Sequence, residues 1–155
     1  MSIEKCGVVS QEFLDLVIYS IYRAVNEVLG EKTWDIVWRS GEVLYEKLEE
    51  LLRLHIVEDY VEVLEKLAEW LQKSGYVDVV RIRKLSENEI EYVMGRPAIV
   101  RGAEKLVKER MVPPHISTSL MFAALRKRGL KAELAGDPQF LLDGSVVERW
   151  KIARL

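Results

Sequence analysis

Several residue types and patterns that would narrow the function are scarce or missing in this sequence of 155 residues. Cys6 is the single cysteine, which excludes an internal disulfide and a metal site built from several thiolates. The most apolar stretch, 13–22, contains Asp15 and is followed by Arg23, so it is too short and too charged to cross a bilayer. The first residues lack the apolar run and cleavage site of a secretory signal. We therefore expect a cytoplasmic protein without a membrane span.

Signals for binding nucleotides or nucleic acids are also missing. Neither G-x-G-x-x-G nor G-x-x-x-x-G-K-[ST] occurs. The formal net charge is −2 with both signs interleaved, which argues against a general nucleic-acid binder. Arg81, Arg83 and Lys84 form a local basic cluster, which we interpret as the solvated face of a strand. Charges dominated by Glu, Lys and Arg, with Asn26 and Asn88 as the only asparagines, indicate a thermophilic source.

The composition that remains, 49% hydrophobic and 31% charged, is typical of one globular domain, which we expect to span 1–155. Helical spacing of apolar residues predicts helices over 10–30, 33–54, 59–75, 99–110 and 117–128. Period-two alternation predicts strands over 76–85, 89–95, 130–134, 139–142 and 145–152. This order predicts an α+β fold with N-terminal helices packed on a small antiparallel sheet of about four strands. Because the first helix has little polar face at its start, we expect it to be central.

Gly41 lies where the apolar stripe of helix 33–54 calls for a large side chain. Glycine inside a helix costs about 1 kcal/mol relative to alanine, so another backbone or a ligand is expected to come close there. Trp34 and Trp38 precede it at one-turn spacing. An aromatic wall beside a missing side chain would suit an apolar cavity, and equally a tight helix contact within the chain or between subunits.

Two histidines are candidates for chemistry. His115 precedes Ser117 and Thr118 at a predicted helix start, where free amides bind anions and a hydroxyl near an imidazole can act as a nucleophile. The alternative is that Ser117 or Thr118 caps the helix and His115 is an ordinary loop residue. His55 follows the Gly41 helix with acidic neighbours, but this spacing is common by chance and we predict no metal site.

The segment VNEVLGEKTWDIVWRSGEVLYEKLEELL (25–52) resembles the N-terminal signature of a ligand-binding superfamily, in which a helix, Leu-Gly, and a helix with an internal glycine follow each other. This superfamily includes the four-vinyl-reductase-like domains of archaea and bacteria and the small transport-particle (TRAPP) subunits of eukaryotic vesicle traffic. GYVDVVRI then matches the first strand after the third helix. PHISTSLMFAALRKRGLKAELAGDPQFLLDGSVVERWKI matches, in order, the later helix, strand and closing hairpin.

The resemblance implies an α+β domain that dimerises through helices and encloses an apolar cavity for a hydrocarbon or acyl-like ligand. Some relatives carry cysteines around the final hairpin, whereas this chain reads ELAGDPQFLLDG, so a metal centre of that kind is not expected. Haem-binding relatives use a proximal histidine and a Tyr-x-Ser-x-Arg element, which is missing here, so we expect no cofactor. Cys6 precedes the helices, which argues against covalent acylation.

Three hypotheses follow. The first is a non-catalytic homodimeric module that binds or senses an apolar small molecule, with a ligand-binding set of Trp34, Trp38, Gly41, Tyr45, His115 and Met121. The second is a scaffold or assembly protein without a ligand, in which Gly41 allows close helix packing across a dimer. The third is an enzyme that uses His115 and a hydroxyl, which requires a deep pocket around that histidine.

Overall fold

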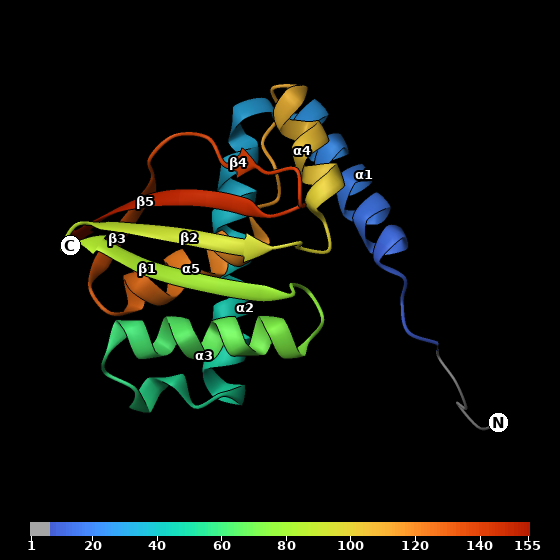
Figure 1. Ribbon diagram of the computed structural model, residues 1–155. Coiled ribbons are helices and arrows are strands. Elements are labelled where there is room, and N and C mark those ends of the chain that lie inside the picture. The colour runs from blue at the N-terminus through green and yellow to red at the C-terminus, as the bar shows by residue number, and fades with distance from the viewer. Residues whose placement is uncertain (1–6) are drawn as a thin grey trace.

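A helical layer packs on one antiparallel sheet in the computed structural model, which describes residues 7–155 (Figure 1). Cys6 therefore lies outside the described residues. The helices are α1 (Gln11–Leu29), η1 (Gly30–Lys32), α2 (Thr33–Leu51), η2 (Leu54–Ile56), α3 (Tyr60–Lys73), α4 (Val100–Lys108) and α5 (Ile116–Lys127). The strands are β1 (Val79–Ser86), β2 (Glu89–Gly95), β3 (Leu130–Leu134), β4 (Gln139–Phe140) and β5 (Val146–Arg154). This arrangement confirms the predicted α+β class.

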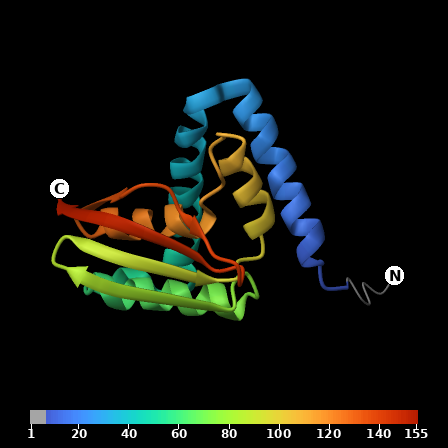
Figure 2. The same cartoon turned by 45° about the horizontal axis from the view of Figure 1, so that its top comes forward.

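The sheet has the strand order β1-β2-β5-β3, and the short strand β4 also pairs with β5. Every pairing is antiparallel. Helices α3 and α5 pack against one face, so the sheet has one buried and one solvated side. Figure 2 shows α3 running along the sheet, whereas α1 stands apart from it on the far side of α4.

Alternation along β5 explains how the sheet contributes to the core. Val146, Trp150 and Ile152 are buried on the helix side, as their spacing predicts. The opposite face carries cross-strand ion pairs such as Arg83–Glu91 at 2.9 Å. Such exposed pairs contribute little to stability, so the inner face holds the domain together.

Gly41 lies at the crossing of α2 and α5. A Cβ at this position would lie 2.3 Å from the backbone C and O atoms of Ser119 and 2.6 Å from the Cβ of Ser119. The close neighbour of Gly41 is therefore a helix of the same chain, which is one of the alternatives expected from the sequence. The crossing joins the two helices directly and fixes the distance between them.

Side chains cap the first turns of α1 and α3. Ser10 Oγ accepts from the Phe13 amide, and Asp59 accepts from the Val61 amide. Helix α5 starts at Ile116 with His115 in the cap position, rather than with Ser117 or Thr118. The hydroxyls of both residues bind groups in the protein interior instead.

The expectation that α1 is central is wrong. It packs mainly on α4, where the Gly102 amide donates to Asp15 Oδ1 at 3.0 Å and Asn26 is buried. Its opposite face leaves Phe13, Leu16 and Val28 largely exposed. The helix thus packs Tyr22 and Ile18 inward against a small second core and leaves an apolar stripe exposed on the other side. No helix of residues 7–155 combines the length and hydropathy needed to cross a membrane.

Candidate functional site

The backbone before α5 places His115 inside the protein. Asn26 binds the Val112 backbone twice, accepting from its amide at 2.8 Å and donating to its carbonyl at 2.9 Å. This clamp ties the Pro113-Pro114 segment to α1. His115 then adopts a left-handed conformation with φ of 44°, and its side chain is only 5% exposed. A non-glycine residue in this conformation is uncommon, and here it turns the imidazole toward the sheet.

Glu148 of β5 is the centre of a buried polar cluster. Its side chain is 2% exposed, and its Oε2 lies 3.1 Å from His115 Nδ1. Its Oε1 accepts from the Thr118 hydroxyl and, at 3.3 Å, from Trp150 Nε1. Burying a carboxylate is costly unless its oxygens have polar partners, and here each oxygen has at least one. The cluster, defined here as His115, Thr118, Glu148 and Trp150, joins α5 to the sheet.

A stack of aromatic rings covers this cluster. Trp34 lies 5.3 Å from Trp38 and 5.4 Å from His115 between ring centroids, with interplanar angles of 16° and 21°. Phe122 continues the stack 5.4 Å from Trp38 and meets Trp150 edge-on at 5.0 Å. Such geometries contribute about 0.5–1.5 kcal/mol per pair beyond area burial. The stack therefore packs on the face of the imidazole, whereas Glu148 meets its Nδ1 edge.

Little space remains beside His115. A void of about 40 Å³ lies next to it, lined by Ser117, Thr118 and Glu148 among others. Ser117 donates to Met94 Sδ at 2.8 Å, and Ser119 donates to the Ile116 carbonyl at 3.2 Å. Since Thr118 donates to Glu148, each hydroxyl of this helix start already has an acceptor. Over residues 7–155, no hydrogen bond links His115 to a hydroxyl, and the void is too small for the deep pocket that nucleophilic catalysis requires.

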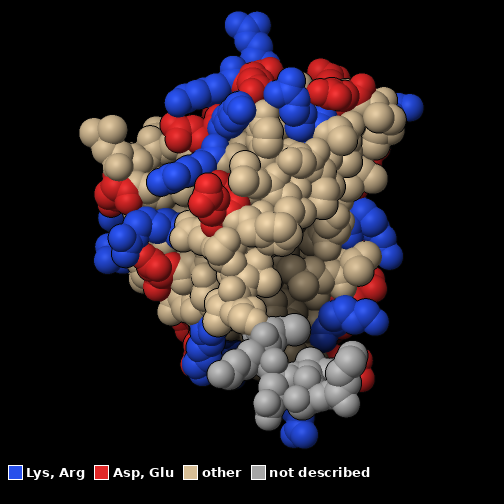
Figure 3. All heavy atoms as spheres, turned by 90° about the vertical axis from the view of Figure 1, so that its right-hand side faces the viewer, with Lys and Arg blue, Asp and Glu red and all other residues tan. Residues whose placement is uncertain are grey.

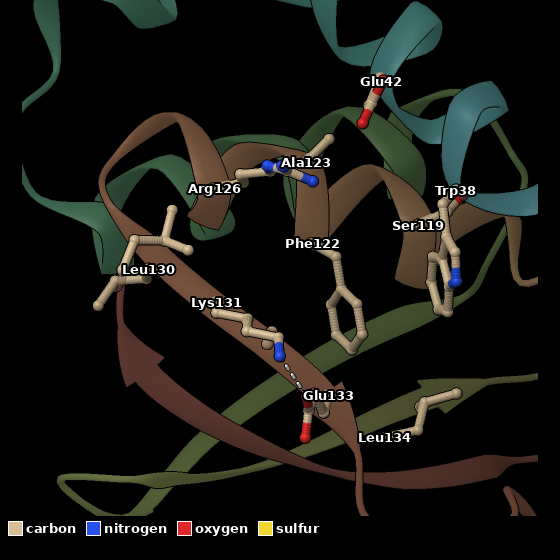
Figure 4. A pocket seen from close by; sticks show the side chains of 12 residues that line it. Trp38, Glu42, Ser119, Phe122, Ala123, Arg126, Leu130, Lys131, Glu133 and Leu134 are labelled. Atoms are coloured by element: carbon tan, nitrogen blue, oxygen red, sulfur yellow. Dashed lines mark ion pairs between the residues drawn. The ribbon is translucent and has the colours of Figure 1, made fainter. Parts of the chain in front are cut away.

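A larger hollow lies on the other flank of α5. This groove of about 450 Å³ runs between α2, α5 and β3 (Figure 4). Its walls combine aromatic, aliphatic and charged side chains: Trp38, Glu42, Ser119, Phe122, Ala123, Arg126, Leu130, Lys131, Ala132, Glu133, Leu134 and Leu155. Lys131 and Glu133 form an ion pair of 2.7 Å at its rim. The groove is the most spacious opening next to the aromatic stack, and Trp38 belongs to both.

The structure brings only part of the predicted ligand-binding set together. Trp34, Trp38 and His115 lie in one stack, and Gly41 contacts the helix that carries the groove. Tyr45 is 1% exposed and accepts a hydrogen bond from Arg128 Nη1 at 2.7 Å. Met121 is fully buried in the main core. For Tyr45 and Met121 the structure shows packing roles, and ligand binding by the set remains a prediction.

Sequence reasoning missed Glu148. A signal was present, since Glu148 shares the parity of Val146, Trp150 and Ile152 on β5 and should therefore face the core. Phe122, which joins the stack to the groove, was also missed. His55 is exposed in η2, and residues 7–155 contain no group of three or more His, Cys, Asp or Glu side chains placed to hold a metal ion.

Comparisons with known proteins support the fold and no more. No protein-family model and no curated protein matches the sequence. Trafficking protein particle complex subunit 3 from Naegleria fowleri, solved covalently bound to palmitic acid, aligns with a TM-score of 0.65 at 12% identity, covering 93% of this chain and 95% of that one. An H-NOX mutant from K. algicida aligns with a TM-score of 0.57 at 13% identity, covering 100% and 82%. A second H-NOX structure, from work on heme distortion, gives 0.57 at 12% identity, covering 99% and 77%. The chain therefore shares the α+β fold of a TRAPP subunit and of H-NOX proteins.

Proposed function

We propose that this protein is a non-catalytic module that binds or senses an apolar small molecule in the groove between α2, α5 and β3. The position of the groove beside the aromatic stack carries this proposal, and its volume of about 450 Å³ lies within the range of small-molecule sites, about 300–1,000 Å³. The two structural relatives with the same fold were solved in work on a bound palmitate and on heme, which supports ligand binding as the general role. We further infer membership of the four-vinyl-reductase-like and transport-particle superfamily, and a cytoplasmic location.

The groove lining suits a hydrocarbon or acyl chain. Phe122 and Trp38 offer ring faces at one end, and Leu130, Ala132 and Leu134 project from alternate positions of β3 along its length. Burial of apolar ligand surface would contribute about 25 cal/mol per Å². Arg126 lies in the same wall without an ion pair among the described residues, and its charge suits a carboxylate at the end of the chain.

The buried cluster has a supporting role in this proposal. Glu148 holds His115, and His115 with Trp34 fixes the ring of Trp38 from behind. Gly41 sets the separation of the two helices that form the groove walls. The predicted site residues thus act as a rigid frame, and Trp38 is the member of the set that contacts the ligand.

Native mass spectrometry of the purified protein, with and without organic extraction, tests the proposal. Palmitic acid and hexadecane serve as probes, and the difference between them reports the contribution of a carboxylate. We expect non-covalent binding that quenches Trp38 fluorescence. Ala132→Trp fills the groove and should abolish binding, whereas Ala153→Trp, on the exposed face of β5, should leave it intact. Equal binding by both variants would exclude the groove.

The exposed stripe of α1 favours a homodimer as part of the same proposal. Phe13 is 61% exposed, Leu16 59%, Ile21 50% and Val28 81%. Figure 3 views the side of the molecule on which α1 lies, and uncharged surface covers its centre while charged side chains lie toward the margin. A stripe of this kind on one helix is the usual mark of a protein contact. If the chain is instead a scaffold without a ligand, this surface is the one that would act.

A matched pair of variants tests the α1 contact. Ile21→Glu places a charge in the stripe and should remove the α1 contact, which lowers the mass measured in sedimentation velocity. Ile56→Glu makes the same change at an exposed isoleucine of η2 and should have no effect. A mass that Ile21→Glu leaves unchanged would argue against this surface, and a lower mass without loss of palmitate binding would separate assembly from ligand binding.

A further inference from the structure

The two edges of the sheet differ in which backbone groups they leave open. On β3, the Ala135 amide donates to Arg149 O at 2.8 Å, and the Leu155 amide donates to Gly129 O at 2.9 Å. Backbone groups of an antiparallel strand point alternately toward and away from the neighbouring strand. The backbone N–H and C=O groups of Lys131 and Glu133 therefore point toward β5, and those of residues 130, 132 and 134 point outward at the free edge.

The β1 edge is better protected by comparison. The same alternation turns the backbone groups of Val80 outward, and its amide donates to Gln72 Oε1 of α3 at 2.8 Å. Arg81 and Arg83 project from the same strand, so a second copy of β1 laid antiparallel would meet like charges. Capping by a side chain and like charge are both known ways in which an edge strand avoids pairing.

The β3 sequence is self-complementary in charge. It reads Leu-Lys-Ala-Glu-Leu with Ala132 at its centre. Antiparallel pairing of two copies about a two-fold axis at Ala132 sets Lys131 opposite Glu133 of the second copy, and Glu133 opposite its Lys131. Leu130 then lies opposite Leu134 of the second copy. The same register also pairs outward-facing residues only with outward-facing residues, so every open N–H and C=O of the strand finds a partner.

We propose that the open edge of β3 is a self-association surface at which two copies of this chain join their sheets. This surface is separate from the α1 stripe, because α1 and β3 lie at opposite ends of the molecule (Figures 1 and 2). It goes beyond ligand binding, although the groove opens along the same edge and pairing sets the grooves of two copies beside each other. Homodimers joined through α1 would thereby assemble further through β3.

A charge-exchange experiment tests this contact by sedimentation equilibrium and light scattering over a concentration series. Lys131→Glu gives two acidic residues on the strand and Glu133→Lys gives two basic ones, so each variant alone sets like charges opposite each other. We expect self-association through β3 to weaken about tenfold or more in each. An equimolar mixture of the two variants restores opposite charges at both positions and should regain the wild-type mass. Lys84→Glu on β1 is the matched control and should change nothing.

A backbone variant gives an independent readout. Ala132→Pro removes an outward amide, so it leaves the β3–β5 ladder intact while it blocks pairing with a second copy. We expect association through β3 to be lost, so that only the α1 contact remains, with an unchanged circular dichroism spectrum. Wild-type mass in both charge variants, or a mixture that fails to regain association, would overturn the proposal. The α1 variant Ile21→Glu leaves β3 untouched, so failure of the β3 contact is distinguishable from failure of the α1 dimer.

Discussion

Helix α5 separates two regions that contain similar residues but differ in how much open space those residues line. On the sheet side, Thr118 and His115 meet Glu148, and only about 40 Å³ of space remains. On the other flank, Ser119, Phe122 and Arg126 line a groove of about 450 Å³. A polar group in the closed region must find a partner inside the protein, whereas one in the groove can be solvated. The closed region therefore determines the shape of the domain, and the open one has room to bind a ligand.

Gly41→Leu should have the largest effect on stability, because Gly41 lies where α2 crosses α5, the helix that borders both regions. A Leu side chain would collide with the Ser119 backbone, which cannot move away as a flexible side chain would. We expect the free energy of unfolding to fall by more than about 3 kcal/mol, or folding to fail. Urea denaturation measures the loss. Gly7→Ala, at a glycine with no neighbour within 4 Å, is the control and should be neutral.

Glu148→Ala should rank second. It leaves Thr118 and Trp150 with buried donors and His115 without its carboxylate, which should lower the free energy of unfolding by about 3–5 kcal/mol. Glu133→Ala removes a carboxylate from the groove rim, where the loss should be within about 0.5 kcal/mol. Similar losses at the two positions in chemical denaturation would contradict the distinction between closed and open regions.

Tyr92→Phe should have the smallest effect. Tyr92 stacks 4.4 Å from Trp150, but its buried hydroxyl has no hydrogen-bond partner among the described residues. Its removal should leave stability unchanged or raise it by up to about 1 kcal/mol. The control is Tyr45→Phe, which deletes the acceptor of Arg128 and should cost about 1 kcal/mol.

Tyr92→Phe also tests how the stability of the protein depends on pH, and the direction of the change can be stated. Burial raises the pKa of Tyr92 above that of a tyrosine in the unfolded chain, which is about 10. The nearby Ser117 hydroxyl lowers this pKa and the charge of Glu148 raises it, each by less than burial does. Above about pH 10 the unfolded state loses the proton more readily than the folded one, so the folded protein loses stability as pH rises. Tyr92→Phe should make this alkaline decline shallower in denaturation at pH 9 to about 11. An unchanged slope would mean that the hydroxyl is not closed off from solvent.

Much of the fold could be predicted because it depends on neighbouring residues. The caps at Ser10 and Asp59, the helical stripe around Gly41 and the alternation of β3 and β5 each involve contacts within one element. The placement of α1 could not be predicted in this way. Its apolar residues indicated burial, but periodicity says only that a face is apolar and not whether this chain covers it.

The candidate site shows the same division. Trp34 and Trp38 were found together because one helix carries both at one-turn spacing. Their neighbour Phe122 comes from a different helix, and Gly41 indicated a close approach without naming Ser119. Such pairings depend on how α2 crosses α5, which no local pattern encodes.

By itself, the sequence determined the helices, the strands and the parity of each strand, because these follow from interactions between residues a few positions apart. Only the tertiary structure decided that Glu148 lies beneath His115. Thr118 and Glu148 are 30 positions apart, and they meet because the register of β5 in the sheet places Glu148 below the start of α5. Only the tertiary structure, too, left β3 open at one edge while Gln72 capped an outward amide of β1 at the other. The physical reason is that a buried charge or an edge strand takes its hydrogen-bond partners from the groups that packing brings near it. Packing is a property of the whole chain.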